Sequence, residues 1–580
     1  MNIIGISAYY HDSAACLLKN GVIVSAVQEE RFSRKKHDFS FPNKAIEYCL
    51  KEGNLSIKEI DAIAFYEKPY LKFERLLYQF VETFPKSAGV FIDSIPLWIS
   101  EKLLVPKKIE KTGFKGKVFY LEHHLSHAAS SFLCSPFKEA AIFTVDGVGE
   151  YTTTAFASGK ENKIKILKEI HFPHSLGLLY STITAYLGFS VNNSEYKVMG
   201  LAPCGKPKFM KEFNKLLKIF EDGSFELNMK YFDYLHKKRM PSKEMEKLFG
   251  KKIRKKESEL TQFHKDIAAS LQKKTEEVIF NSLNKLFDET KTENLCIAGG
   301  VGLNSVANGK ILSNTPFKKI WVQPAAGDAG TAIGTALYVY NSIMNKPRKW
   351  KFESCFLGPS YSDQEIEKYL KKNEIKYSKF NSQTEIAKKT AQLIKENKVI
   401  GWFQGKMEFG PRALGSRSIL SNACHPNMKD ILNKKVKHRE FFRPFAPVIL
   451  FEEVSKWFES DQPVPEPADY MLMVYQIKKE KRKIIPSVTH VDGSGRLQVI
   501  RKIQHPLYYQ VIKEFQKLTG VPIIINTSFN IRGEPIVCAP QDAYKCMMGT
   551  GIDFTIMGSY LIKREDNPKD FWDSEKLAID

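Results

Sequence analysis

The chain has 580 residues, more than one hydrophobic core normally supports, so we expect two or more domains. Its composition, 43% hydrophobic and 26% charged, is that of an ordinary globular protein. No apolar run reaches the roughly 20 residues that a membrane helix needs, and His and Asp interrupt the apolar N-terminus where a signal peptide needs an unbroken core, so the sequence predicts a cytoplasmic protein.

The net charge of +22, from 87 basic and 65 acidic residues, raises the question of a polyanionic partner such as RNA or DNA. The excess is mostly lysine in short runs, such as residues 251–257 and 478–483, which are typical of solvated faces. No aromatic and basic nucleic-acid module accompanies them, so the pattern argues against a nucleic-acid partner. Nine cysteines without a CxxC pair fit reduced, mostly buried thiols.

Two segments of the sequence predict the same order of strands and turns. Residues 3–32 read as a strand, a polar turn and two further strands, and residues 140–172 repeat this order. The repeat predicts an internal duplication of an α/β unit. Duplicated units of this type are typical of the actin-like ATPase architecture, although a fold by itself does not set a function.

The first turn carries a candidate base at the end of a strand. His11, in YYHDS, is placed where an imidazole can take a proton from a hydroxyl near neutral pH, and a loop histidine bonded to backbone is the open alternative. The stretch ERFSRKKHD follows, with enough positive charge to hold a phosphate or adenylate, or to be plain surface.

A metal site is predicted from two histidines and two aspartates. His123 and His127 are four residues apart, so on a helix they project from one face, and Asp146 ends the next apolar run. Asp328, flanked by glycines, completes a set that suits iron, manganese or zinc. Two surface or capping histidines are the alternative. The missing Glu of HExxH argues against a zinc protease.

A glycine turn between a strand and a helix predicts a nucleotide site. In AGGVGLNS, backbone amides can approach a phosphate or ribose closely. The stretch is not a Walker A loop, because no GK[ST] follows the glycines. The residues concerned are Gly299, Gly300, Gly302 and Asn304. Beyond them the helical pattern is lost near residue 350, where we place a domain boundary.

In the second domain, arginines and polar side chains lie next to apolar strands in the sequence. An unpaired interior charge costs several kcal/mol, so four such arginines predict a phosphate pocket, and arginine suits phosphate through its planar fork. The alternative is that each arginine pairs with a buried acid. The candidate residues are Arg412, Arg417, Arg443, Arg496, Asn526 and Ser528.

Together these motifs resemble the NodU/CmcH-type O-carbamoyltransferases across nearly the whole chain. The matching stretches are YYHDSAA, EERFSRKKHD, EHHLSHAAS, TVDGVGE, EYKVMGLAP, AGGVGLNS, GDAGTAIG, FGPRALGSRSIL, FFRPFAP and NTSFNIRGEPIV. The resemblance implies an α/β fold, with a duplicated actin-like (ribonuclease-H-like) carbamoyl-transfer domain over residues 1–350 and a YrdC-like α/β domain over residues 351–580. Cys204 in APCG departs from the aromatic residue that family members often carry, which leaves the substrate's shape open.

The resemblance also implies the chemistry. The second domain would make carbamoyl adenylate from carbamoyl phosphate and ATP, with Mg²⁺, and its arginines, Asn526 and Ser528 would hold the anions. The first domain would transfer the carbamoyl group to a hydroxyl of a sugar or natural product. There His123, His127, Asp146 and Asp328 would bind a metal, Fe(II) in relatives, with His11 as base and Lys36 stabilising charge.

Two alternatives stay open from the sequence. One is a tRNA threonylcarbamoyl-type transferase, which the positive charge alone supports and the second domain opposes. The other is a non-catalytic nucleotide-binding protein on an actin-like scaffold. The acceptor and the oligomeric state are not specified by the sequence, and a homodimer is one option.

Overall fold

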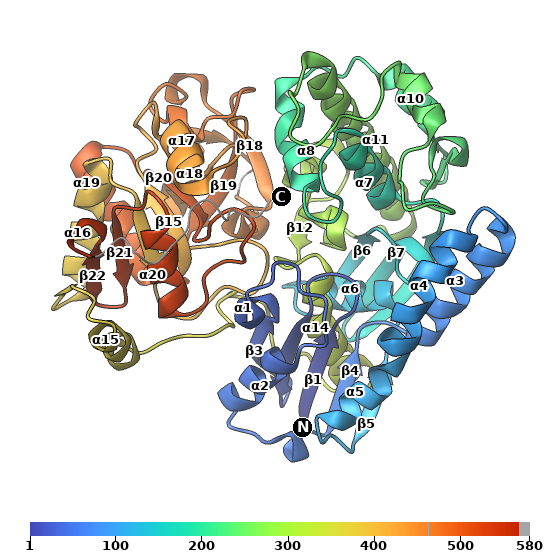
Figure 1. The fold of residues 1–580 in the computed structure, drawn as a ribbon, viewed down its shortest axis with the longest axis horizontal. Helices are drawn as coiled ribbons and strands as arrows, with labels where there is room; N and C mark the ends of the chain where they lie inside the picture. Colours follow the sequence, from blue (N-terminus) through green and yellow to red (C-terminus); the bar gives the residue numbers. More distant parts are fainter. Residues whose placement is uncertain (462, 568–580) are drawn as a thin grey trace. The chain divides into compact units, whose positions relative to one another are not determined.

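The computed structural model describes residues 1–461 and 463–567. Contacts divide the chain into two compact units, coloured along the sequence in Figure 1. The first unit comprises Met1–Glu29 and His37–Phe352, and the second comprises Glu30–Lys36 and the described chain from Glu353 onward. Glu30–Lys36 joins the second unit because Arg34 donates to the carbonyls of Pro535 and Ile536, at 2.9 and 2.7 Å.

The first unit contains two five-stranded sheets of the same topology. The first has the order β3-β2-β1-β4-β5, in which β1, β2 and β3 form an antiparallel meander and β4 and β5 continue parallel to β1. The second has the order β12-β11-β6-β7-β8, with the same meander and the same parallel pair. The predicted duplication and actin-like fold are confirmed.

The strands of the first sheet are β1 (Asn2–Ser7), β2 (Ala14–Lys19), β3 (Val22–Gln28), β4 (Ala62–Phe65) and β5 (Lys117–Tyr120). Those of the second are β6 (Glu139–Val145), β7 (Thr152–Lys160), β8 (Lys163–His171), β11 (Asn294–Ala298) and β12 (Lys319–Val322). A separate pair is formed by β9 (Leu217–Ile219) and β10 (Phe225–Leu227).

Two buried helices join the sheets. Helix α6 (His123–Phe132) packs on β6, β7 and β11, helix α14 (Asp328–Leu337) packs on β1, β2 and β4, and the two helices pack against each other (Figure 1). A Cβ at Gly334 would come within 2.1 Å of the Ser126 carbonyl oxygen, so glycine is required for this approach. The chain turns that precede these helices therefore meet in one place.

Helix α2 packs on β2 and β3 of the first sheet, and helix α11 packs on β6 and β7 of the second. The longest, α11, packs against α7, α8 and α9. The bounds are α2 (Asn43–Glu52), α3 (Pro69–Thr83), α4 (Ala88–Ser100), α5 (Val105–Lys111), α7 (Leu176–Tyr186), α8 (Glu195–Leu201), α9 (Met210–Leu216), α10 (Lys243–Phe249), α11 (Gln262–Thr290), α12 (Ser305–Asn308) and α13 (Ile311–Asn314).

The second unit is a mixed α/β fold on one ten-stranded sheet of order β13-β22-β21-β14-β15-β20-β16-β19-β18-β17. The strands are β13 (Ser378–Lys379), β14 (Ile400–Phe403), β15 (Arg417–Ser421), β16 (Ala446–Leu450), β17 (Phe458–Glu459), β18 (Met473–Ile477), β19 (Ser494–Ile500), β20 (Ile523–Ser528), β21 (Phe554–Met557) and β22 (Tyr560–Lys563). Its helices are α1 (Glu30–Ser33), α15 (Asp363–Lys372), α16 (Gln383–Lys395), α17 (Met428–Ile431), α18 (Val454–Trp457), α19 (Pro506–Thr519) and α20 (Pro540–Met548).

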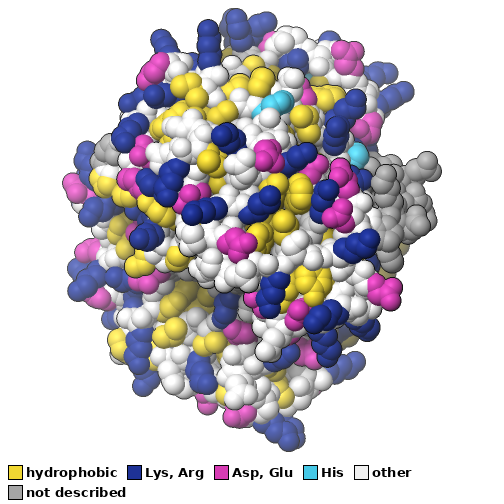
Figure 2. Space-filling view, turned by 90° about the vertical axis from the view of Figure 1, so that its left-hand side faces the viewer, with side chains coloured by type: hydrophobic (Ala, Val, Ile, Leu, Met, Phe, Trp, Pro, Cys, Tyr) yellow, Lys and Arg dark blue, Asp and Glu magenta, His cyan; other side chains and the backbone are white. Residues whose placement is uncertain are grey.

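The cysteines and the charged surface residues are distributed as the sequence composition predicts. All nine cysteines are free, and all except Cys204 and Cys424 are buried. Figure 2 shows Lys and Arg spread among acidic and hydrophobic side chains on the face drawn, without one large basic patch. Over residues 1–461 and 463–567, no helix combines the length and the apolar content that crossing a bilayer requires.

Candidate functional site

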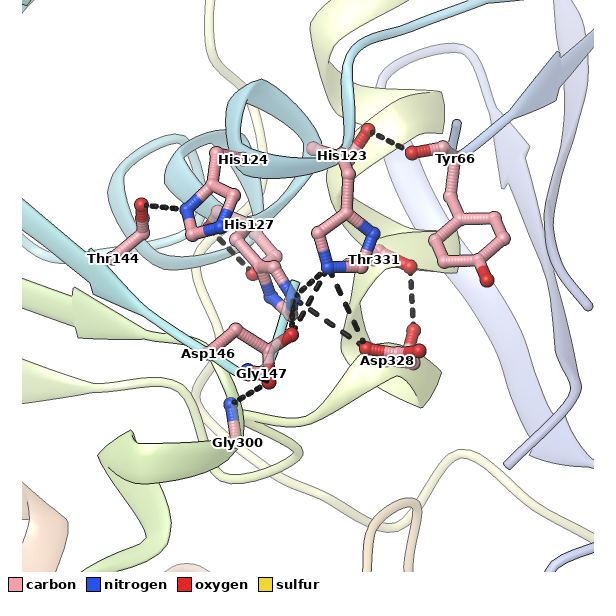
Figure 3. Close-up of polar contacts among 12 residues, drawn as sticks. Tyr66, His123, His124, His127, Thr144, Asp146, Gly147, Gly300, Asp328 and Thr331 are labelled. Atoms are coloured by element: carbon pink, nitrogen blue, oxygen red, sulfur yellow. Dashed lines mark hydrogen bonds and ion pairs between the residues drawn. The ribbon is translucent and has the colours of Figure 1, made fainter. Parts of the chain in front are cut away.

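The four residues predicted as metal ligands lie together in the first unit (Figure 3). The Nε2 atoms of His123 and His127 lie 3.0 and 3.1 Å from Oδ2 of Asp146, and 3.1 Å from each other. Oδ1 of Asp328 lies 3.8 and 3.6 Å from the same two nitrogens. One ligand atom from each residue falls within 4.8 Å of the other three.

Secondary structure positions this cluster. His123 and His127 occupy successive turns of α6, so their imidazoles share a face. The backbone amide of His123, at the helix start, donates to the Glu150 carboxylate at 3.0 Å, which suits the positive end of the helix dipole. Asp146 follows β6 directly, and Asp328 is the first residue of α14.

The chemistry of the cluster fits a divalent cation. Both histidine side chains are fully buried, and Oδ2 of the buried Asp328 has no hydrogen-bond partner among the described residues. Two Nε2 atoms 3.1 Å apart that both face one carboxylate oxygen are spaced like ligands around one ion, because protons on both nitrogens would lie close together and repel each other. The two-histidine, two-carboxylate set suits iron, manganese or zinc without selecting among them.

The acids of the cluster already stabilise positive charge. Burial opposes the charged form of His127, yet hydrogen bonds from His127 to Asp146 and Asp328 raise its pKa to about 9. Burial likewise opposes ionisation of Asp146, but hydrogen bonds with His123 and His127 hold the pKa of Asp146 well below its usual value. The two carboxylates are therefore placed to balance a cation.

The glycine turn lies against the cluster. The amides of Gly147 and Gly300 donate to Oδ1 of Asp146, at 2.7 and 3.2 Å, which leaves Oδ2 directed at the histidines. Gly299 has a φ of +94°, and a Cβ there would come within 2.2 Å of the Val145 carbonyl oxygen. Only glycine allows this turn to approach Asp146.

The remaining two residues of the predicted nucleotide turn have structural contacts. The amide of Gly302 donates to the Gly299 carbonyl at 2.9 Å and closes the turn. The Asn304 side chain accepts from the Ala307 amide, which caps α12, and exchanges hydrogen bonds with Gln272 at 3.0 and 3.1 Å. The Asn304 amide group is thus engaged within the fold.

His11 belongs to a group that sequence reasoning missed. Nδ1 of His11 lies 2.8 Å from one oxygen of Asp12, and Nδ1 of His37 lies 2.7 Å from the other. Nε2 of His11 faces the Asn192 carbonyl, and Nε2 of His37 lies 2.9 Å from the Asn193 side chain. The 25-residue separation of Asp12 and His37 gave no signal of this pairing.

The electrostatics of His11 favour its protonated form. Burial opposes the charge, but Asp12 and the Asn192 carbonyl together raise the pKa of His11 to about 10. A protonated imidazole cannot accept a proton, so a role as base requires that His11 first release one. Lys36, the other predicted catalytic residue, lies in the segment that belongs to the second unit.

In the second unit, Arg417 and Asn526 are engaged internally. The fully buried Arg417 donates to the carbonyls of Gln404 at 2.9 Å and Pro359 at 3.0 Å, and its guanidinium stacks 3.7 Å from the Phe403 ring centroid. Asn526 donates to the Ala413 carbonyl at 3.0 Å. Both side chains are therefore engaged by backbone carbonyls within the second unit, and we do not assign them to a phosphate pocket.

A basic cluster that includes Ser528 lies elsewhere in this unit. Nζ of the buried Lys437 donates to the carbonyl of Ser528 and to the carbonyl and side-chain oxygens of Asn530, the last two at 3.0 and 2.9 Å. Burial, followed by the charge of Arg439, lowers the pKa of Lys437 well below its usual value, and Arg443 and Lys36 act in the same direction. Lys437 sits in a lysine-rich run, 434–437, that carries no sequence signal of burial.

The other predicted arginines lie on the same sheet or beside it. Arg496 is a half-buried residue of β19, and Arg412 lies in the loop before β15. Arg443 has a carboxylate oxygen of Glu440 at 3.7 Å. The structure therefore brings Ser528, Arg443 and Lys36 into one electrostatic neighbourhood around Lys437.

Comparison with known proteins covers nearly the whole chain. Residues 2–337 match the family model described as carbamoyltransferase N-terminus, and residues 391–564 match that described as carbamoyltransferase C-terminus. An uncharacterised protein of Synechocystis sp. is 46% identical over 98% of this chain and 97% of its own length. Nodulation protein NolNO of Sinorhizobium fredii is 36% identical over 99% of this chain and 82% of its own. Nodulation protein NolO of Bradyrhizobium diazoefficiens is 34% identical over 79% and 82%.

Proposed function

The chain belongs to the carbamoyltransferase family, and we propose that it is an ATP-dependent O-carbamoyltransferase that works through carbamoyl adenylate. Its acceptor is a hydroxyl of a small molecule, a sugar or a natural product. The observation that carries the proposal is the buried cluster of His123, His127, Asp146 and Asp328 against a glycine turn. Such a cluster can hold a phosphate and an activated carbonyl side by side.

Adenylate formation is assigned to the second unit, and thus to the region from residue 351 together with Glu30–Lys36. Carbamoyl phosphate loses phosphate to water and gives carbamate, whose oxygen attacks the α-phosphorus of Mg²⁺-bound ATP and expels pyrophosphate. The anions would be held by Lys437, Arg443 and Ser528, with Arg412 and Arg496 completing the pocket. This neighbourhood has clustered positive charge, and phosphates would offset it.

Transfer is assigned to the first unit. A divalent metal, iron by family resemblance, would be held there by the two histidines and two aspartates and would supply positive charge at the adenylate phosphate and carbonyl. The glycine turn lies beside Asp146, where the adenylate phosphate would bind, and its amides hold the turn in place: the Gly300 amide donates to Asp146 and the Gly299 amide to the Ala326 carbonyl. The fit of the donor set, with its unpaired Asp328 oxygen, supports this assignment.

The acceptor hydroxyl would attack the carbonyl carbon, and the bond from that carbon to the adenylate oxygen would break. The hydroxyl proton passes to Nε2 of neutral His11, which requires that Nε2 first leave the Asn192 carbonyl, and AMP leaves with the electron pair. Asp12 then stabilises the imidazolium, since it already faces Nδ1 of His11 at 2.8 Å.

The test is pyrophosphate exchange. Protein, ATP, Mg²⁺ and labelled pyrophosphate are mixed with or without carbamoyl phosphate, and label in ATP is measured. We expect exchange that requires carbamoyl phosphate. A nucleotide-binding protein without turnover gives none, and a threonylcarbamoyl-type enzyme would instead require threonine and bicarbonate.

A further inference from the structure

Helix α3 carries an arginine whose buried donors have no acceptor. The Arg75 side chain is 7% exposed, and its Nε and Nη1 atoms are buried without a hydrogen-bond partner among the described residues. Its guanidinium lies 4.7 Å from the centroid of the Phe172 ring, which covers one face and fixes its plane. Buried guanidinium donors without an acceptor among the described residues are costly, so an anionic oxygen group bound there would stabilise this geometry.

The neighbouring acids are committed to other donors. Glu67 is paired with Lys72, whose Nζ lies 2.5 Å from its carboxylate. Glu150 accepts from the backbone amides of Lys68 and His123, at 2.8 and 3.0 Å. Arg75 itself has no ion pair within 4.0 Å in the described parts of the chain. Glu67 and Glu150 therefore offset the charge of Arg75 only from a distance, without a direct ion pair to its guanidinium.

A second cation adds positive charge to this region. Lys102 lies over the Trp98 ring at 4.7 Å and likewise has no ion pair among the described residues. Burial, followed by the charge of Lys72, lowers the pKa of Lys102 to about 8, and Arg75 contributes in the same direction. An anion bound close to Arg75 and Lys102 would therefore stabilise the protonated forms of both.

The positively charged region around Arg75 lies close to the proposed transfer site. Nζ of Lys72 lies 4.8 Å from the centroid of the Tyr10 ring, and Tyr10 directly precedes His11. On its other side, the Tyr10 hydroxyl would lie 3.4 Å from a Cβ on Gly147, the residue after Asp146. Tyr10 therefore lies between this positively charged region and both the proposed base and the proposed metal cluster.

We propose that Arg75 is a specificity-determining residue that binds an anionic oxygen group of the acceptor, a carboxylate or a phosphate ester, while the acceptor's hydroxyl lies at His11. The inference rests on the proposed function for the presence of an acceptor. It goes further in naming the chemical class of that acceptor. The planar fork of arginine suits either anion, so the two sources share one chemistry and are separated by experiment.

The test is a binding measurement that needs no turnover. Titration calorimetry compares D-glucose, D-glucuronate and D-glucose 6-phosphate with the metal-loaded wild-type protein, without ATP or carbamoyl phosphate. We expect one of the two acids to bind about tenfold to a hundredfold more tightly than glucose. Arg75→Gln should remove this preference, and Arg75→Lys should retain part of it because charge remains without the fork. Arg239→Gln, at a partly exposed ion pair, should leave the preference unchanged.

Three results would overturn the inference. Equal or absent binding of the three probes by the wild type removes the pocket. A preference that persists in Arg75→Gln assigns it to other residues. A loss of AMP affinity in Arg75→Gln, with the acid preference intact, places Arg75 in the nucleotide site instead. Should Arg75→Gln fail to fold, Arg75→Lys decides by the same criteria, and pyrophosphate exchange reports separately on the proposed function.

Discussion

The Nε2 atoms of His123 and His127 lie 3.1 Å apart, and both face one oxygen of Asp146. Protons on both Nε2 atoms would repel each other at this distance, whereas a bound cation engages both nitrogens. We therefore predict that His127→Gln lowers the metal content per chain by more than about tenfold, measured by elemental analysis. His171→Gln, at an exposed histidine of the same unit, should retain its metal. Full occupancy in His127→Gln would refute the ligand assignment.

The pH dependence of transfer should follow His11. Because Asp12 and the Asn192 carbonyl raise the pKa of His11 to about 10, the neutral base becomes more abundant as pH rises toward that value. We predict that kcat/KM for the acceptor increases from pH 7 to about pH 10. Asp12→Asn should shift this rise to lower pH, because the carboxylate no longer holds the proton. His37→Gln leaves Asp12 beside His11 and serves as the control. Identical profiles in wild type and Asp12→Asn would exclude His11 as the titrating group.

The interaction between His11 and Asp12 should also stabilise the fold, and this contribution should depend on pH. The pKa of His11 is raised in the fold and that of Asp12 is lowered, so their interaction stabilises the protein above the unfolded pKa of Asp, about 4, and below that of His, about 6.5. This contribution is lost as pH rises toward about 10. We predict that the difference in melting temperature between wild type and Asp12→Asn is larger at pH 6 than at pH 10. A constant difference across this range would contradict the linkage.

Lys437 should matter for adenylate formation and little for stability. Burial and the nearby Arg439 already disfavour its charge, so Lys437→Met removes an unfavourable cation while it leaves backbone carbonyls without a donor. We predict loss of carbamoyl-phosphate-dependent pyrophosphate exchange, with a melting temperature within about 5 °C of the wild type. Retained exchange would place the reactants elsewhere.

Arg417, in contrast to Lys437, should matter for stability and little for the binding of carbamoyl phosphate. Its guanidinium is bonded to backbone carbonyls and stacked on Phe403, so Arg417→Met leaves buried acceptors without donors. We predict a loss of unfolding free energy on the order of 3 kcal/mol, measured by urea denaturation, with the KM for carbamoyl phosphate unchanged in the folded fraction. A raised KM without lost stability would return Arg417 to the phosphate pocket.

The contrast between His127 and Arg417 shows what the sequence could predict. The helical spacing of His123 and His127 and the strand-end position of Asp146 follow from local periodicity, and the repeated strand order predicted how the two sheets are built. For arginines, the sequence shows charge beside a strand but not whether backbone carbonyls point at it. Arg417 and Lys437 are both buried cations, and only the fold reveals which one has other cations around it.

Long-range pairing set a second limit. His37 belongs to the motif EERFSRKKHD, but its contact with Asp12 depends on a positive φ at each of the two residues. No local sequence pattern predicts these turns. The burial of Arg75 could not be predicted from the sequence for a similar reason, because an arginine on an amphipathic helix is ordinarily solvated. Its burial against Phe172 comes from a segment that lies almost a hundred residues away in the sequence.

The central claim is that one chain makes carbamoyl adenylate and transfers the carbamoyl group at separate sites. The most direct measurement is His127→Gln assayed twice, for carbamoyl-phosphate-dependent pyrophosphate exchange and for carbamoylation of an acceptor hydroxyl detected by mass spectrometry. We predict exchange at the wild-type rate and no carbamoylated product. Loss of exchange together with transfer, or unimpaired transfer, would contradict the account.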